Sequence, residues 1–278
     1  MRQNSVFQDD LRPINRSKLR LLIGKVYYTL SRYILWHSGR FIFAKECSSK
    51  QLPYECYSHE TPLKRDLIGL ALEYQSNKII NLKLAVNKIN GLILKPGETF
   101  SYWKLIGKPT VKKGYVPGMI LYCGKYHMGI GGGLCQLSNL LYWISLHTPL
   151  TIVERYRHSY DVFPDSNRTQ PFGSGATCVY PYRDFMIRND TDFDFHLFLK
   201  VGETHLKGSW MTNRPVPYQY EIVERKHLFK SEYWGGFSRH NELYRIRYSL
   251  EGKYIDEEYI TENHALMMYS PFLTDFSS

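Results

Sequence analysis

The chain has 278 residues, of which 43% are hydrophobic and 22% are charged. These are ordinary globular values that exclude a largely disordered chain, and the length suffices for one large domain or two small ones. The formal net charge is +10, but residues 1–50 hold ten Lys and Arg against three acidic residues, a net charge of +7. Because the excess charge lies on an appendage and the remainder is nearly balanced, we expect no nucleic-acid partner.

From about residue 17 the pattern predicts a helix, with apolar side chains at three-to-four spacing. They are Leu19, Leu22, Ile23, Val26, Leu30, Tyr33 and Ile34. Lys18, Lys25 and Arg32 recur every seven residues and share the opposite face. The favoured interpretation is a surface helix packed on the domain with a solvated basic face. The alternative is a basic amphipathic helix in peripheral contact with an anionic membrane.

No segment is expected to cross a membrane. The longest candidate, residues 19–36, is interrupted by Arg20, Lys25 and Arg32. No apolar run followed by a small-residue cleavage site marks a signal peptide. The predicted location is therefore the cytoplasm, with the inner membrane face as an alternative.

Further along the chain, residues 48–61 are polar and indicate a connector. A second helix is expected over about residues 77–90, ended by Gly91. Beyond Tyr180 the chain is rich in aromatic and β-branched residues separated by turn signals, which predicts antiparallel strands. The expected strands are residues 193–201, 205–211, 218–223, 243–250 and 254–260.

These elements predict an α+β fold with a helical N-terminal part, a central cysteine-bearing helix packed on a mixed or antiparallel sheet, and a C-terminal antiparallel β-meander. We divide the chain into three parts. They are a basic tail and helix (residues 1–50), a core with the candidate site (51–190) and a β-rich part (191–278).

The densest chemistry surrounds Cys135. Gly129 and residues 131–133 place four glycines within five positions, which predicts a loop outside helices and strands. The helical pattern that follows puts Cys135 in the first turn, where unpaired N–H groups and the helix dipole favour a thiolate. The N–H groups of Gly131, Gly132 and Gly133 are candidates to bind an oxyanion. Gln136 and Ser138 are candidates to position a substrate.

A histidine is needed as general base for such a thiol. His158, beyond a predicted strand at residues 150–153, is favoured over His147, which lies at a helix end where capping is more common. The alternative for Cys135 itself is a buried cysteine that acts as a small apolar residue. The glycine run does not match a dinucleotide loop, since Leu134 stands where glycine or alanine is required.

The five cysteines include no CxxC pair and favour reduced thiols. A metal site formed by Cys135, His147 and His158 has no recognised ligand spacing. We expect neither a metal ion nor a cofactor.

Several runs resemble the VanW family. They are KPGETFSYW (residues 95–103), Gly114-Tyr115, GGGLCQ (131–136), ERYRH (154–158) and ITENHALMMY (260–269). The resemblance covers most of the chain from about Gln51, and the last run is similar to the short accessory members encoded beside vancomycin-resistance genes. Some longer members are L,D-transpeptidases, which cross-link peptidoglycan stem peptides with a cysteine. The resemblance implies Cys135 as nucleophile and His158 as base.

Two features depart from the family pattern. Asp-Ala-Thr is usual after the histidine run, but this chain has Gly175-Ala176-Thr177. Asp161 or Asp165 would then orient the base. The other departure is the missing export signal.

The sequence thus supports two hypotheses. The first is cysteine acyl transfer on a peptidoglycan stem peptide or its precursor, linked to glycopeptide resistance. The second is a non-catalytic accessory protein that binds cell-wall precursors or their enzymes through the aromatic meander.

Overall fold

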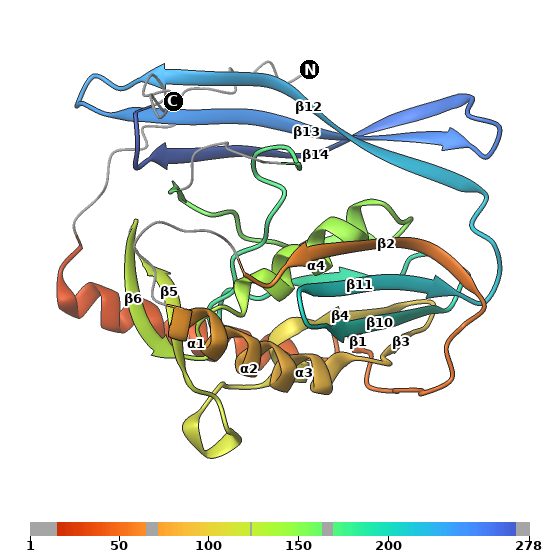
Figure 1. Cartoon of the computed structure of the whole chain (residues 1–278), viewed down its shortest axis with the longest axis horizontal. Coiled ribbons are helices and arrows are strands. Elements are labelled where there is room, and N and C mark those ends of the chain that lie inside the picture. The colour runs from red at the N-terminus through yellow and green to blue at the C-terminus, as the bar shows by residue number, and fades with distance from the viewer. Residues whose placement is uncertain (1–15, 65–71, 123, 163–168, 271–278) are drawn as a thin grey trace.

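The computed structural model describes residues 16–64, 72–122, 124–162 and 169–270. The α+β fold is confirmed. Among the described residues, the strands form three four-stranded sheets and one two-stranded hairpin. Figure 1 shows the long strands of one sheet lying across the helices and the other sheets.

The first sheet is antiparallel and has the order β2-β11-β10-β3. Its strands are β2 (Tyr54–Pro62), β11 (His205–Thr212), β10 (Phe195–Val201) and β3 (Ile93–Leu94). The interpretation of residues 48–61 as a connector is therefore wrong, because β2 is an edge strand with a polar exposed face. The sheet joins strands from both sides of residue 190, so the core and the β-rich part share one layer.

Two helices pack against this sheet. The cysteine-bearing helix α4 (Cys135–Leu146) contacts β2 and β11, and α2 (Leu72–Ile89) contacts β10. On α2, Leu82, Ala85, Val86 and Ile89 are buried at helical spacing. Gly91 follows with a φ of 85°, as expected for a residue that ends a helix.

The second sheet is mixed and lies beside the first through β3 and β4. It has the order β1-β4-β9-β7, with β1 parallel to β4 and the other pairs antiparallel. Its strands are β1 (Ile42–Phe43), β4 (Glu98–Ser101), β9 (Met186–Arg188) and β7 (Thr151–Glu154). The short helix α3 (Tyr102–Ile106) follows β4 directly, and the 3-10 turn η1 (Val111–Lys113) comes next. Tyr102, Phe100 and Phe185 from this region are fully buried and fill the core beside α4.

The third sheet is the predicted meander, formed by β12 (Tyr218–Ser231), β13 (Phe237–Ser249) and β14 (Tyr254–Met267). The short strand β8 (Tyr160–Asp161) adds to β14 in parallel. The strands are longer than predicted at one end, where β12 and β13 pair as far as Ser231 and Phe237 beside the turn that contains Gly235 and Gly236.

A β-hairpin of β5 (Pro117–Tyr122) and β6 (Lys125–Ile130) precedes the glycine-rich loop. Gly129 lies inside β6, opposite Gly118. The prediction that all four glycines lie outside regular structure is therefore wrong for Gly129. Pairing with Gly118 places it in the strand, and the close approach of Ile120, 2.4 Å from where its Cβ would lie, favours glycine there.

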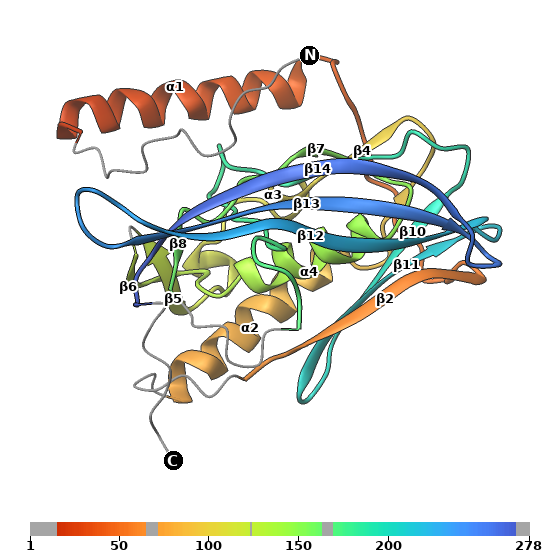
Figure 2. The same ribbon diagram turned by 90° about the horizontal axis from the view of Figure 1, so that it is seen from above.

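The first helix, α1 (Lys18–His37), is present, but its packing differs from the prediction. Its buried residues are Arg32 and Trp36, and Figure 2 shows it along the edge of the molecule. The apolar stripe expected to pack on the domain is exposed instead, from Leu19 at 67% to Ile34 at 68%. No described helix is long and apolar enough to span a membrane.

Candidate active site around Cys135

Cys135 is the first residue of α4, so its predicted place in the first helical turn is confirmed. The residue is half-buried and its thiol is free. The backbone N–H groups of Cys178 and of Cys135 itself lower the pKa of this thiol, but burial has the larger effect, and the pKa is raised. Desolvation of the thiol therefore opposes a thiolate in the free protein, and the expected thiolate stays a prediction.

A second cysteine, Cys178, lies beside the first. Burial raises its pKa well above the ordinary value, and the charges of Cys135 and Asp184 act in the same direction. Tyr102 is also buried here, and its hydroxyl donates to the Leu134 carbonyl at 3.0 Å. The sequence did not single out Cys178 as part of the site, since it lies 43 positions from Cys135 with no motif around it.

Next to these thiols is a buried group of charges. Arg32 of α1 forms an ion pair with Glu154 of β7 and lies 3.9 Å from Asp184. Asp184 accepts hydrogen bonds from Ser101 Oγ (2.5 Å) and from the N–H of Trp103 (2.8 Å). Burial nevertheless raises the pKa of Asp184 to about 6. Sequence reasoning missed this group because its members come from three distant segments.

The three loop glycines have bonded N–H groups. Gly131 donates to the Val116 carbonyl (3.1 Å), Gly132 to that of Gly129 (3.0 Å) and Gly133 to that of Met119 (3.0 Å). A substrate oxyanion would have to displace these bonds, so the assigned oxyanion role stays a prediction.

Close packing gives these glycines a structural explanation. A Cβ at Gly132 would lie 2.1 Å from the backbone of Gly118, and a Cβ at Gly131 would lie 2.7 Å from Pro109. The absence of side chains here lets the β5–β6 hairpin approach the loop that leads into α4.

The polar residues of the first turn of α4 also have partners within the chain. Gln136 Nε2 donates to Thr61 Oγ1 and to the Pro62 carbonyl, both at 2.9 Å. Ser138 is fully buried, and its hydroxyl donates to the Ala176 carbonyl at 2.7 Å. Both residues hold neighbouring segments in place, and their substrate-positioning roles stay predictions.

His158 is half-buried, and its pKa is lowered to about 4, first by burial and then by the charge of Arg155. Its imidazole is therefore neutral at pH 7 and able to accept a proton. No hydrogen bond joins it to Cys135 among the described residues, so their pairing stays a prediction. His147 has the expected place at the helix end, with its ring stacked on Tyr57 at 4.0 Å.

The carboxylate proposed to orient the base has other partners. Asp161 pairs with Arg239 at 3.3 Å and accepts a hydrogen bond from the Tyr269 hydroxyl at 2.9 Å. Asp165 lies outside the described residues, as does Cys123. Gly175 lies close to a neighbouring side chain, since a Cβ there would be 2.7 Å from Asn139 Oδ1.

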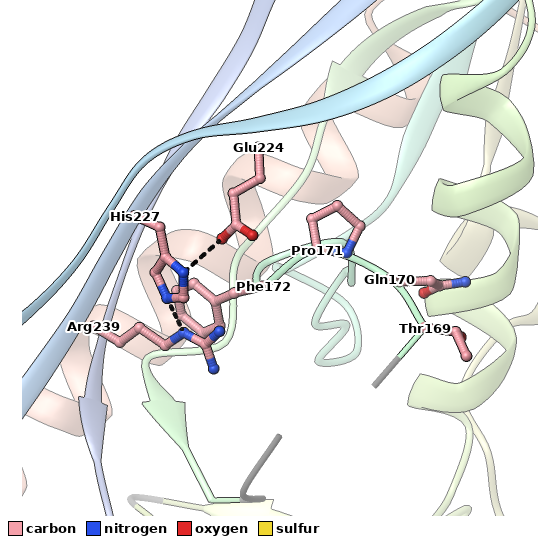
Figure 3. A pocket seen from close by; sticks show the side chains of 7 residues that line it. All are labelled: Thr169, Gln170, Pro171, Phe172, Glu224, His227 and Arg239. Atoms are coloured by element: carbon pink, nitrogen blue, oxygen red, sulfur yellow. Dashed lines mark hydrogen bonds and ion pairs between the residues drawn. The ribbon is translucent and has the colours of Figure 1, made fainter. Parts of the chain in front are cut away.

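A surface cavity of about 400 Å³ lies between the meander and the segment that leads to Cys178. Figure 3 shows Glu224 and His227 of β12 and Arg239 of β13 on one side, with the Phe172 ring against Arg239, and residues 169–171 on the other. Arg239 Nε donates to His227 Nε2 at 2.8 Å, and Glu224 lies 3.8 Å from His227 Nδ1. Cys135 does not line this cavity, so we do not assign it to the thiol chemistry.

Comparison with known proteins places the chain in a family. The VanW like protein model matches residues 77–211. The chain is 33% identical over 243 residues to the vancomycin B-type resistance protein VanW of Enterococcus faecalis, which covers 86% of this chain and 88% of that protein. It is also 34% identical over 109 residues to the uncharacterized protein YoaR of Bacillus subtilis, covering 39% of this chain and 34% of that protein. No solved structure matches. Because the identity to the enterococcal protein extends over most of both sequences, the chain belongs to the VanW family.

Proposed function

We propose that this protein acts in glycopeptide resistance through cysteine acyl transfer on a peptidoglycan stem peptide or precursor, with Cys135 as the nucleophile. The resistance link rests on the similarity to the enterococcal protein. The observation that carries the chemistry is the position of the thiol on the first residue of α4, where the backbone N–H groups of Cys178 and Cys135 lower its pKa against the effect of burial. Such donors stabilise a thiolate once it forms.

In the proposed reaction, His158 accepts the thiol proton and the Cys135 sulfur attacks a peptide carbonyl carbon. The C–N bond then breaks, and His158 returns the proton to the leaving amine. Water or an amine resolves the acyl-enzyme in the same way. In the free protein the raised pKa of Cys135 and the lowered pKa of His158 both disfavour transfer of the proton from the thiol to the imidazole. We therefore infer that this transfer occurs only when substrate is bound.

A second candidate function is supported by different observations. The N–H groups of the loop glycines have partners, and Gln136 and Ser138 are tied to neighbouring segments. The meander exposes aromatic side chains, including Tyr218, Phe229, Tyr233, Tyr254 and Tyr259. These features fit a non-catalytic accessory protein that binds cell-wall precursors or their enzymes.

The test is intact-mass and peptide mass spectrometry after incubation with synthetic stem peptides, including D-amino-acid ended ones. Acyl transfer predicts an adduct on Cys135 that is absent in Cys135→Ser and retained in Cys47→Ser, the exposed-thiol control. In cells, Cys135→Ser should abolish the contribution to resistance. Full resistance with Cys135→Ser and no adduct on the wild type would favour the accessory function. The cytoplasmic location stays a prediction in either case.

A further inference from the structure

The apolar face of α1 is exposed along most of the helix. At about 100° per residue, its side chains lie within an arc of about 140°. The members at the centre of this arc, Val26 and Leu30, are 51% and 58% exposed. We call the set the α1 stripe; it consists of Leu19, Leu22, Ile23, Val26, Tyr27, Leu30 and Ile34.

The way α1 docks explains why the stripe is turned away from the body. The contact surface includes Arg32, which pairs with Glu154, and Trp36, which donates to Ser101 Oγ at 3.1 Å. Tyr33 also belongs to it, since its hydroxyl lies 2.9 Å from that of Tyr180. Because the body offers carboxylates at this point, the basic face of α1 turns inward near its C-terminal end. The apolar face on the other side of the helix then points to solvent and does not pack on the core.

Basic side chains flank the stripe on both sides. Lys18 and Lys25 lie at one border of the arc and Arg20 at the other, and all three are exposed. No Asp or Glu occurs between residues 11 and 45. An exposed apolar arc bordered only by positive charge is complementary to an anionic lipid surface, where the apolar residues enter the acyl boundary and the cations meet the headgroups.

We propose that α1 is an in-plane membrane anchor, with the α1 stripe buried in the surface of an anionic bilayer. The helix is about 30 Å long and joins the body through its C-terminal turns. Seated in this way, it would hold the protein at the membrane surface without spanning it. The proposal is independent of the chemistry assigned to Cys135.

The test uses the full chain and flotation with vesicles of phosphatidylcholine alone or with phosphatidylglycerol. We expect at least tenfold stronger binding to the anionic vesicles, weakened by salt. Ile23→Glu with Leu30→Glu should abolish binding. Val111→Glu, which replaces an equally exposed apolar residue in η1, should not change it. Circular dichroism and thermal unfolding confirm that each variant is folded.

If something other than lipid covers the α1 stripe, the same experiments give different results. If the wild type fails to bind either vesicle, or if the double variant binds as tightly as the wild type, the proposal is overturned. A wild-type dimer that becomes monomeric in the double variant, without vesicle binding, would assign the stripe to a second copy of the chain. Binding that appears only after removal of residues 1–15 would assign it to that segment. Either result would also overturn the proposal.

Discussion

Arg32 on α1 forms an ion pair with Glu154 on β7, although 122 positions separate the two residues. The same guanidinium also donates to the Tyr182 carbonyl at 3.1 Å and lies near Asp184. This contact fixes α1 to the body next to the buried thiols, and it decides which face of the helix points outward.

Replacing Arg32 with methionine should destabilise the protein strongly. The change leaves Glu154 and the buried Asp184 without their cation, which costs about 3 to 5 kcal/mol for a buried ion pair that loses one partner. Urea unfolding measures the difference. Lys25→Met on the exposed part of the same helix is the matched control and should stay within about 0.5 kcal/mol of wild type. Equal effects of the two substitutions would show that the ion pair does not anchor α1.

The free energy of unfolding should rise with pH between about 4 and 6.5. Burial lowers the pKa values of His147, His158 and His240 to about 4, so in this range the unfolded chain binds protons that the folded protein does not. Stability is therefore lost as pH falls through this window. Denaturant unfolding at pH 4.5, 5.5 and 6.5 measures the slope. His147→Gln should reduce the total rise in the free energy of unfolding across this pH window by up to about 3 kcal/mol.

Asp184 should contribute to the pH dependence with the opposite sign. Its folded pKa of about 6 lies above the ordinary 3.8, so the folded protein binds the extra proton, and stability falls as pH rises between these values. Asp184→Asn should therefore steepen the rise seen for wild type in the same unfolding series. A flatter slope in this variant would contradict the assignment of the raised pKa to Asp184.

The thiol of Cys135 should react as a protonated, shielded cysteine in the free protein. Because burial raises its pKa, alkylation by iodoacetamide should become appreciable only at alkaline pH and should lag behind that of exposed Cys47. His158→Ala should leave this profile unchanged. Peptide mass spectrometry after timed alkylation distinguishes the two thiols. Rapid alkylation of Cys135 below pH 7 that depends on His158 would instead reveal a preformed thiolate–imidazolium pair.

Gly132→Ala should destabilise the protein by about 1 to 3 kcal/mol, the usual cost of overpacking. The new methyl group would meet the Gly118 backbone, which cannot move aside as a flexible side chain would. Gly24→Ala is the control, since its Cβ meets nothing within 4 Å and alanine favours the helix. Thermal unfolding compares the two. A neutral Gly132→Ala would refute the packing explanation and return this glycine to a substrate role.

Much of the local structure could be predicted from residues close in sequence. The helix expected over about residues 77–90 corresponds to α2, and Gly91 follows its end as expected. The start of α4 at Cys135 followed from glycines succeeded by a helical pattern. β2 was missed because its polar, half-exposed sequence becomes a strand only through pairing with β11, which lies about 150 positions away.

The sequence by itself determined the helices α1, α2 and α4, the C-terminal meander, the place of Cys135 at a helix start and the membership of a family, since these depend on short-range patterns and on identity. The tertiary structure decided the rest. It turned the apolar face of α1 outward, gave the N–H groups of the loop glycines their partners, and placed Cys178 between Cys135 and the charge of Asp184. The physical reason is that desolvation and charge act over a few ångströms in space, and the groups that surround this thiol come from segments far apart in the chain.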